Sequence, residues 1–298
     1  MDATAIDSNG LVHRAGNLVK TGLLLAALSA LVLVLGRRLG GANGLVMAGG
    51  LVLVMNVVSF WFSDRIALAM NGARELPRSE LPWLHALVQQ LASRAELPVP
   101  RLYVVASDTP NAFATGRSPE HAAIAVTTGL LQHLDRRELT GVLAHELAHV
   151  KNRDTLIMTV AATLAGVITQ LAQWAFFWGG SLLGGRSDEG EEGGSAFSTL
   201  GALLVAPIAA TLLQLAVSRS REYDADATAA QLTGDPMALA NALARLEQGN
   251  RALPMPNAAA TAHLYIVNPL SGGLLSSLFS THPPMAERIE RLVAMRAR

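Results

Sequence analysis

The sequence predicts a mainly α-helical membrane protein with four transmembrane helices and a cytoplasmic α+β domain built from two separated polar stretches. Of the 298 residues, 51% are hydrophobic and only 15% are charged, whereas soluble globular chains carry about 25% charged residues. Long uncharged spans account for this deficit. The polar stretches carry both helix and strand patterns, so we expect them to form the folded domain.

The uncharged spans form two pairs. Leu18–Gly36 and Gly44–Phe62 follow each other closely, and the second runs for about 19 residues, roughly the length that crosses a ~30 Å hydrocarbon core. Thr155–Gly180 and a span from about Ala196 to Ser218 enclose an acidic, Gly-rich loop. Polar residues inside the third span leave an alternative open, in which the second pair is buried in a soluble core.

These spans set the expected organisation of the chain. The segments are an N-terminal tail (1–17), a transmembrane hairpin (18–62), a first part of the domain (63–154), a second hairpin (155–218) and a second part of the domain (219–298). Basic residues flank the spans mostly on one side, which the positive-inside rule assigns to the cytoplasm. They are Arg14, Lys20, Arg65, Arg74, Arg78, Lys151, Arg153, Arg219 and Arg221, and the exceptions are Arg37 and Arg38.

The first polar stretch contains one amphipathic helix and two strand patterns. Apolar residues at helical spacing predict a helix over Ser79–Glu96 with Ser79 as its N-cap. Arg101–Ala106 and His121–Thr127 read as short strands separated by turn residues. We expect the two strands to pair like a hairpin.

The strongest chemical signal is an H-E-x-x-H pattern inside a helix that begins at Asp135. Asp135 and Glu138 have the spacing of a capping box. His145 and His149 lie one turn apart, so both imidazoles can reach one Zn²⁺ ion. Glu146 is close enough to serve as a general base. The chain has no cysteine, so histidines and carboxylates must hold any metal.

A catalytic zinc ion usually has three protein ligands and an open position. Glu222 and Asp226 lie four residues apart in a helix-compatible run, where Glu222 is a candidate ligand and Asp226 can orient a ligating histidine. In the alternative, Glu222, Asp224 and Asp226 lie on a solvated helix face and pair with Arg219 and Arg221. Spacing alone leaves the two equal. Gly141, one turn before the first histidine of the pattern, is expected to leave room for another group beside the metal.

Charge and motifs exclude two classes of partner. The chain has 23 basic and 23 acidic residues, whereas nucleic-acid binding requires a basic face. It contains no G-x-x-x-x-G-K-[ST] motif, so we expect no nucleotide partner.

Five sequence blocks, in order along nearly the whole chain, resemble one family. NAFATG from Asn111, VTTGLL from Val126, HELAH from His145, SRSREYDAD from Ser218 and THPPMAERIERL from Thr281 look like the HtpX family of membrane-bound zinc metalloproteases, relatives of the prenyl-CAAX endoproteases. The resemblance implies a zincin-type (gluzincin) catalytic domain, one Zn²⁺ per chain, and a bacterial inner-membrane protein whose active site faces the cytoplasm. It also implies a stress-related role in quality control, with unfolded, misfolded or damaged membrane proteins as substrates.

The resemblance further implies roles for individual residues. His145, His149 and Glu222 correspond to the zinc ligands, and Glu146 corresponds to the general base. Asp226 fits the family's second acidic position, beside the ligands.

Three more residues are candidates on the same basis. His282 lies where the family has a histidine near the site, and a donor there can stabilise an oxyanion. Equally, His282 is a helix-entry histidine before Pro283. Asn111–Ala114, which includes the candidates Asn111 and Phe113, and the following strand Ala122–Val126 resemble the edge strand along which such proteases bind extended substrates. The alternative is a core hairpin with Phe113 packed inside.

The expected reaction is hydrolysis of a peptide bond. Zinc lowers the pKa of its bound water and polarises the scissile carbonyl, and Glu146 takes the water's proton and passes it to the leaving amine. One alternative is an intramembrane-cleaving metalloprotease, which the charged residues around the motif helix disfavour. The other is a non-catalytic membrane scaffold with a structural metal, in which loss of Glu146 changes nothing.

Overall fold

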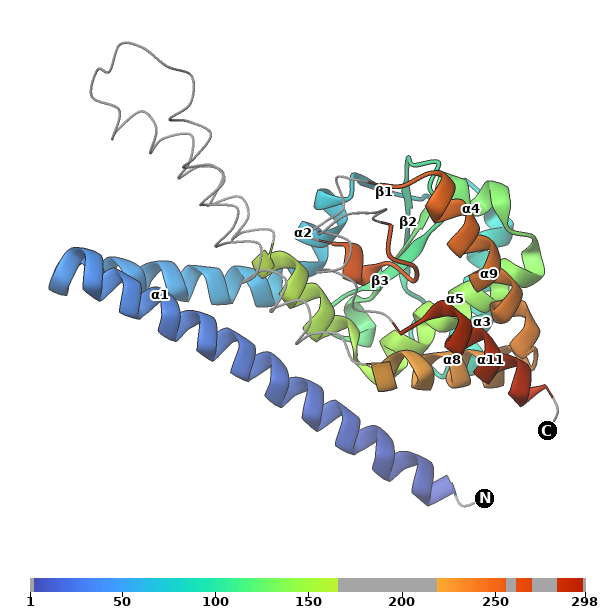
Figure 1. Cartoon of the computed structure of the whole chain (residues 1–298), viewed down its shortest axis with the longest axis horizontal. Coiled ribbons are helices and arrows are strands. Elements are labelled where there is room, and N and C mark those ends of the chain that lie inside the picture. The colour runs from blue at the N-terminus through green and yellow to red at the C-terminus, as the bar shows by residue number, and fades with distance from the viewer. Residues whose placement is uncertain (1–2, 166–218, 256–260, 270–282, 297–298) are drawn as a thin grey trace, which may run out of the picture.

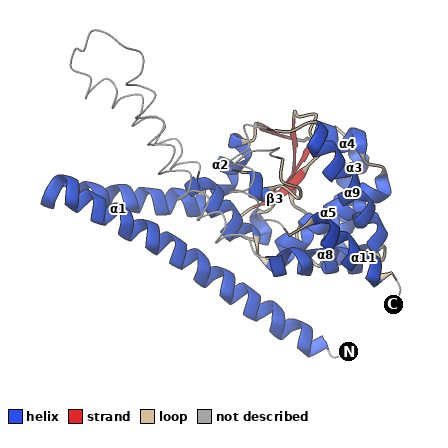
Figure 2. Ribbon diagram, viewed as in Figure 1, coloured by secondary structure: helices blue, strands red, loops and turns tan. Residues whose placement is uncertain are grey.

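The computed structural model describes residues 3–165, 219–255, 261–269 and 283–296. Figure 1 shows a long helical arm joined to a rounded domain that holds the sheet and most of the other helices. Figure 2 shows that strands make up a small part of a mainly helical chain. The predicted fourth span and His282 lie outside the described residues.

The arm is helix α1 (Ala3–Trp61), which folds back on itself at Gly41, where φ is 58° and ψ is −136°. Glycine adopts this left-handed conformation without the strain that a Cβ would cause. The two limbs meet so closely that a Cβ on Gly44 would overlap the carbonyl oxygen of Gly36. Residues predicted as a tail are helical from Ala3 onward.

Two stretches of the arm, Thr21–Arg38 and Gly40–Trp61, are long and apolar enough to cross a membrane, by length and composition alone. They match the predicted first hairpin. Only 14% of the first stretch and 11% of the second is buried. Of the predicted third span the structure describes the beginning, where Thr155–Ala165 is a short apolar helix.

The chain enters the domain through α2 (Ser63–Met70), β1 (Ala73–Glu75) and α3 (Pro82–Ala95). The prediction that Ser79 caps α3 is wrong, because the N-cap is Leu81. A residue before proline is disfavoured in the helical region, so the helix begins at Pro82 itself. The predicted apolar face is confirmed, since Leu84 and Val88 are fully buried.

The sheet has four strands in the order β1-β2-β4-β3. Strand β2 (Arg101–Val105) pairs in parallel with β4 (Ala123–Thr127), and β3 (Ala112–Thr115) pairs antiparallel with the other side of β4. The predicted hairpin of the two strands is therefore wrong. The segment between them forms a third strand, so the chain crosses over before β4 and returns in the direction of β2. The expectation of an edge strand at Ala122–Val126 is wrong as well, because β4 pairs on both sides and only β3 lies at that edge.

Helices cover the sheet and complete the domain. They are α4 (Thr128–His133), α5 (Arg136–Asn152), α8 (Arg219–Thr233), α9 (Pro236–Ala252) and α11 (Met285–Met295), with short 3₁₀ turns η1 (Pro119–His121) and η3 (Ala262–Leu264). Side chains alternate between the two faces of each strand. Ile124 and Val126 enter a core with α3, α5 and α9, whereas Ala123 and Ala125 enter a second core with α2 and the helix Thr155–Ala165.

Candidate metal centre

The candidate site is built on α5, and local sequence fixes where this helix begins. The Asp135 carboxylate accepts the backbone N–H of Glu138 at 2.8 Å, and the Glu138 carboxylate accepts the N–H of Asp135 at 3.1 Å. The predicted capping box is confirmed. Because α5 packs against α3, α8, α9 and β3, every residue from Gly141 to Val150 is buried.

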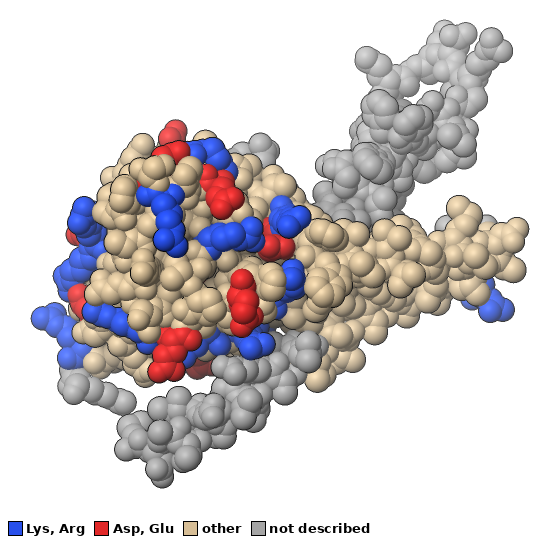
Figure 3. All heavy atoms as spheres, turned by 180° about the vertical axis from the view of Figure 1, so that it is seen from behind, with Lys and Arg blue, Asp and Glu red and all other residues tan. Residues whose placement is uncertain are grey.

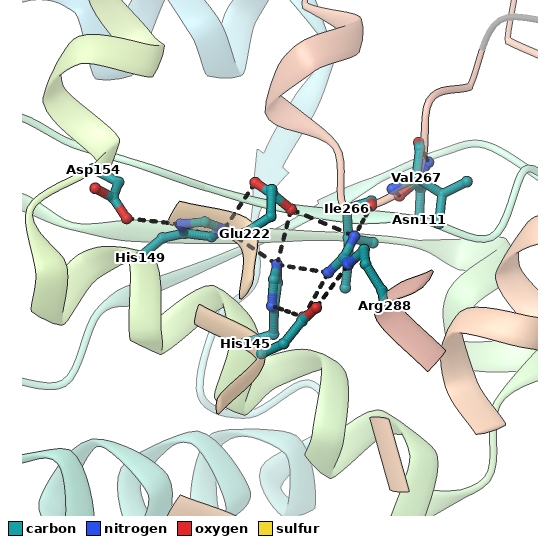
Figure 4. Close-up of polar contacts among 9 residues, drawn as sticks. Asn111, His145, His149, Asp154, Glu222, Ile266, Val267 and Arg288 are labelled. Atoms are coloured by element: carbon teal, nitrogen blue, oxygen red, sulfur yellow. Dashed lines mark hydrogen bonds and ion pairs between the residues drawn. The ribbon is translucent and has the colours of Figure 1, made fainter. Parts of the chain in front are cut away.

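Three side chains converge where α5 meets α8 (Figure 4). The Glu222 carboxylate, near the start of α8, lies 3.8 Å from His145 Nε2 and 3.6 Å from His149 Nε2. One possible ligand atom from each residue lies within 4.8 Å of the other two. Glu222 and Asp226 are each only 2% exposed, so the alternative of a solvated acidic face is wrong.

The donor set fits a divalent cation. The two Nε2 atoms lie 3.1 Å apart, and two ligands of one tetrahedral zinc ion lie roughly 3.4 Å apart when each bond is about 2.0–2.1 Å. Two imidazoles and a carboxylate are also the ligands of several catalytic zinc sites. His145, His149 and Glu222 are therefore arranged to hold such an ion.

Each of the two histidines has a carboxylate at its other ring nitrogen. His145 Nδ1 lies 2.9 Å from Asp226 Oδ1, and His149 Nδ1 lies 3.1 Å from Asp154 Oδ2. Such carboxylates fix the tautomer and orient Nε2 toward a metal. Asp226 thus lies beside His145, where the predicted role in orienting a ligating histidine requires a carboxylate.

Asp154 was missed by the sequence analysis, although a local signal exists. Arg153 ends α5 in the left-handed conformation, with φ 59°. The chain turns back, and the N–H of Asp154 donates to the carbonyl of His149 at 3.0 Å. This turn returns the Asp154 side chain to the imidazole of His149. A carboxylate five residues after the second histidine was the available clue.

Arg288 on α11 contacts the two buried acids of α8, Glu222 and Asp226 (Figure 4). It donates two hydrogen bonds to Asp226, at 2.8 and 2.7 Å, and its Nη1 lies 3.4 Å from Glu222. It also donates to the carbonyl of Ile266 at 3.1 Å. The side chain is fully buried, where a charge needs such partners. Its signal in the sequence was a charge on the apolar face of α11, beside Ile289 and Leu292.

Glu146 lies within the same buried region and faces the edge of the sheet. Burial raises the pKa of Glu146 to about 7, although the charge of His149 and a hydrogen bond from the backbone of Ala114 act in the opposite direction. A carboxyl group with a pKa near neutral pH is suited to accept and release a proton.

The two histidines differ in their electrostatic surroundings. Burial lowers the pKa of His145 to about 4 despite its contact with Asp226. Burial also lowers the pKa of His149, but the Asp154 hydrogen bond and the Glu222 charge outweigh it and raise this pKa to about 9. The pKa of the Asp226 carboxyl is lowered, because Arg288 outweighs the effect of burial. The carboxylates thus outweigh burial at His149 but not at His145.

Asn111 and Phe113 are buried on the strand side of the site. Phe113 packs edge-on against Tyr265, with ring centroids 5.1 Å apart. The Asn111 amide donates to Val267 at 2.7 Å and to Asn250 at 3.0 Å. Both side chains hold the core together, which matches the packed alternative for Phe113.

Gly141 serves helix packing instead of leaving room beside the metal. A Cβ at this position would lie 2.6 Å from the backbone nitrogen of Leu239. The expected free space is therefore filled by the backbone of α9, and that part of the prediction is wrong.

Two histidines one turn apart, a glutamate from a second helix and a buried glutamate between the histidines define the H-E-x-x-H class of metalloproteases. The comparisons with known proteins agree. Residues 78–296 match the model of peptidase family M48.

Curated relatives are similar over most of their length. A protein named "Protease HtpX homolog" from Syntrophobacter fumaroxidans is 52% identical over 282 residues, covering 94% of this chain and 100% of the relative. One of the same name from Pyrococcus furiosus is 52% identical, covering 92% and 94%. The crystal structure of S. mikatae Ste24p has 22% identity and a TM-score of 0.49, covering 95% of this chain and 67% of that one.

On the family match and the two relatives, the chain belongs to peptidase family M48 and is a metalloprotease.

Proposed function

We propose that the protein is a zinc-dependent endopeptidase of the bacterial inner membrane that cleaves misfolded or damaged membrane proteins on their cytoplasmic side. The observation that carries the proposal is the convergence of His145, His149 and Glu222 around one point, with Glu146 buried beside it. The quality-control role in stressed cells rests on the resemblance to the HtpX family, whose name the relatives carry.

The arm supports a place in the bilayer. Large apolar side chains that would be buried in a soluble protein are exposed along it, among them Val46, Met47 and Leu53. Apolar surface left in water costs about 25 cal/mol per Å², and lipid removes this cost. In Figure 3 the part of the arm that is drawn in colour is almost free of charged side chains, with a basic group at its far end. The second pair of spans and the cytoplasmic orientation belong to the same proposal.

In the proposed mechanism, Glu146 moves the proton. A zinc ion held by the three ligands would polarise the scissile carbonyl and lower the pKa of water. Glu146 takes a proton from the attacking water and gives it to the leaving amine. Asp154 and Asp226 keep the ligand histidines in one orientation.

The outer edge of β3 is the proposed place for an extended substrate. The sheet order puts β3 at an edge, and the backbone N–H of Ala114 donates to Glu146. Part of this edge is already used, since the carbonyl of Ala112 accepts the N–H of Ile266 at 3.1 Å. A peptide added beside Ala114 would run past the general base through main-chain hydrogen bonds. Such binding tolerates many sequences.

The packing of α5 argues against cleavage within the bilayer. This helix is surrounded by α3, α8, α9 and β3, and its first turn carries the exposed residues Arg136 and Arg137. A helix so placed lies in the rounded domain, outside the apolar arm.

The test is elemental analysis and casein hydrolysis with the detergent-purified full-length protein. We expect about one zinc per chain in the wild type, and loss of both metal and activity in Glu222→Ala. Asp224→Ala is the matched control, because Asp224 is an exposed acid two residues away on α8, and it should keep both.

Glu146→Gln separates an enzyme from a scaffold. It should keep its zinc and lose about 10²–10⁴-fold in rate. Full activity in this variant would refute the mechanism, and full zinc content in Glu222→Ala would refute the ligand set.

A further inference from the structure

A surface pocket of about 480 Å³ lies where the apolar arm meets the domain, away from the metal centre. The end of α1, the start of α2, strand β2 and the turn at η1 enclose it. Its lining combines aromatic and basic side chains, chiefly Trp61, Phe62, Arg65, Arg101 and Arg117, with the acids Asp64 and Glu120.

The arginines of this pocket are not equivalent. Arg101 is paired with the buried Asp64 at 3.0 Å. Arg65 and Arg117 have no carboxylate partner within the described part of the chain. The second acid, Glu120, accepts a hydrogen bond from Ser118. The pocket therefore presents two guanidinium groups that remain available to an anion.

Aromatic rings hold both available guanidinium groups at the pocket. The Arg117 guanidinium lies 4.9 Å from the centre of the Trp61 ring, and its Nη1 donates to the Trp61 carbonyl at 3.3 Å. The Arg65 guanidinium lies 5.8 Å from the centre of the Phe62 ring. Stacking of this kind leaves the edge of the guanidinium free to bind a phosphate with two parallel hydrogen bonds.

An exposed apolar track leads from the pocket along the arm. Leu53, Val54 and Val57 lie one to two turns before Trp61 and are 67%, 58% and 46% exposed. A ligand that fits both features has an anionic phosphate head and apolar tails. Free phosphate would use the pocket alone and leave the track uncovered.

We propose that this pocket binds the phosphate of a glycerophospholipid headgroup between Arg65 and Arg117, with the acyl chains along Leu53, Val54 and Val57. The proposal rests on the membrane placement of the arm given above. Bound lipid would fix the height of the domain relative to the bilayer surface, because the pocket joins the arm to α2 and to the sheet. The negative surface potential of an anionic leaflet also attracts basic residues that lie near it.

The test is a titration of the full-length protein in maltoside detergent, followed by native mass spectrometry. The probes are short-chain phosphatidylglycerol, glycerol phosphate as a head without tails, and short-chain diacylglycerol as tails without a phosphate. We expect phosphatidylglycerol to bind most tightly. Its affinity should fall about tenfold for each arginine lost, as for a charge-assisted hydrogen bond.

The variants are Arg65→Gln and Arg65→Gln/Arg117→Gln. The single variant leaves the contact between Arg117 and Trp61 intact, so a folding defect at the end of α1 cannot explain its effect. The matched control is Arg78→Gln/Arg94→Gln, which removes two exposed arginines outside the pocket and should bind like the wild type. Equal binding by the pocket variants and the wild type would refute the proposal.

Glycerol phosphate, diacylglycerol and a measurement of activity distinguish the remaining outcomes. Glycerol phosphate binding as tightly as the lipid would show a phosphate pocket without a lipid site, and diacylglycerol binding as tightly would show an apolar track alone. Either result overturns the proposal. Casein hydrolysis by the double variant in detergent should match the wild type. If the wild type itself failed to hydrolyse casein, the enzymatic proposal would fail while the lipid titration kept its meaning.

Discussion

The arm and the metal centre depart from ordinary burial in opposite directions. Around the metal centre the domain buries charged groups, including Glu146, Glu222, Asp226 and Arg288. The arm exposes large apolar residues such as Leu53. Buried charges require partners and exposed apolar surface requires a cover. Each departure therefore supports one of the proposals made above: a bound cation in one region and lipid in the other.

The largest effect is expected from removal of the metal. A chelator should abolish hydrolysis, and zinc should restore it. The chelator should also lower the unfolding temperature, since a bound ligand at a thousand times its Kd stabilises the folded state by about 4 kcal/mol. The control is Glu222→Ala, whose unfolding temperature should not respond to the chelator. An unchanged wild-type unfolding temperature would contradict the cation site.

Arg288→Met should produce the next largest effect. It leaves Asp226 and Glu222 without their buried counter-charge, and breaking such an arrangement costs about 3–5 kcal/mol. Chemical denaturation in detergent measures the loss. Arg291→Met is the control on the same helix, because its side chain is 52% exposed and should cost under about 1 kcal/mol. Similar losses of unfolding free energy in the two variants would show that Arg288 stabilises the domain through packing and not through its charge.

Gly141→Ala tests the close approach of α5 and α9. The new Cβ would meet the backbone of Leu239, so the helices must move apart at a cost of about 1–3 kcal/mol. The half-buried neighbour Thr140 provides a control, and Thr140→Ala should cost less. A stabilised Gly141→Ala protein would contradict the packing described here.

The smallest effect on the domain is expected from the arm. Val54→Ser should change the stability of the domain by less than about 0.5 kcal/mol in detergent, because the side chain is 58% exposed. Recovery in the membrane fraction should fall in the same variant. A large loss of domain stability would show that the arm packs as a protein core instead of facing lipid.

Local patterns predicted the parts of the fold that depend on neighbouring residues. The capping box at Asp135 and the helical spacing of His145 and His149 are set within a few residues, and both are confirmed. The start of α3 was misplaced because Ser79 is a good cap in isolation, whereas Pro82 decides where the helix begins.

Features that depend on distant contacts were harder to predict. The parallel pairing of β2 with β4 depends on β3, a four-residue strand that reads as part of a turn. Arg288 reaches Asp226 from a helix about 60 residues away. The sequence around either residue does not indicate that the two side chains meet. The family resemblance, and not spacing, gave Glu222 its predicted role. Its position beside the histidines depends on the packing of α8 against α5.

The packing of α8 against α5 also closes a long loop of the chain. His149 and Glu222 are about 70 residues apart in the chain, on either side of the stretch 155–218. Closing a loop of this length costs on the order of 4 kcal/mol in chain entropy. A cation that joins both residues acts as a cross-link at the base of this loop. Such a cation would hold the two halves of the domain together at the point where the peptide bond would be cut, so that an assembled domain and a competent site would arise in the same step.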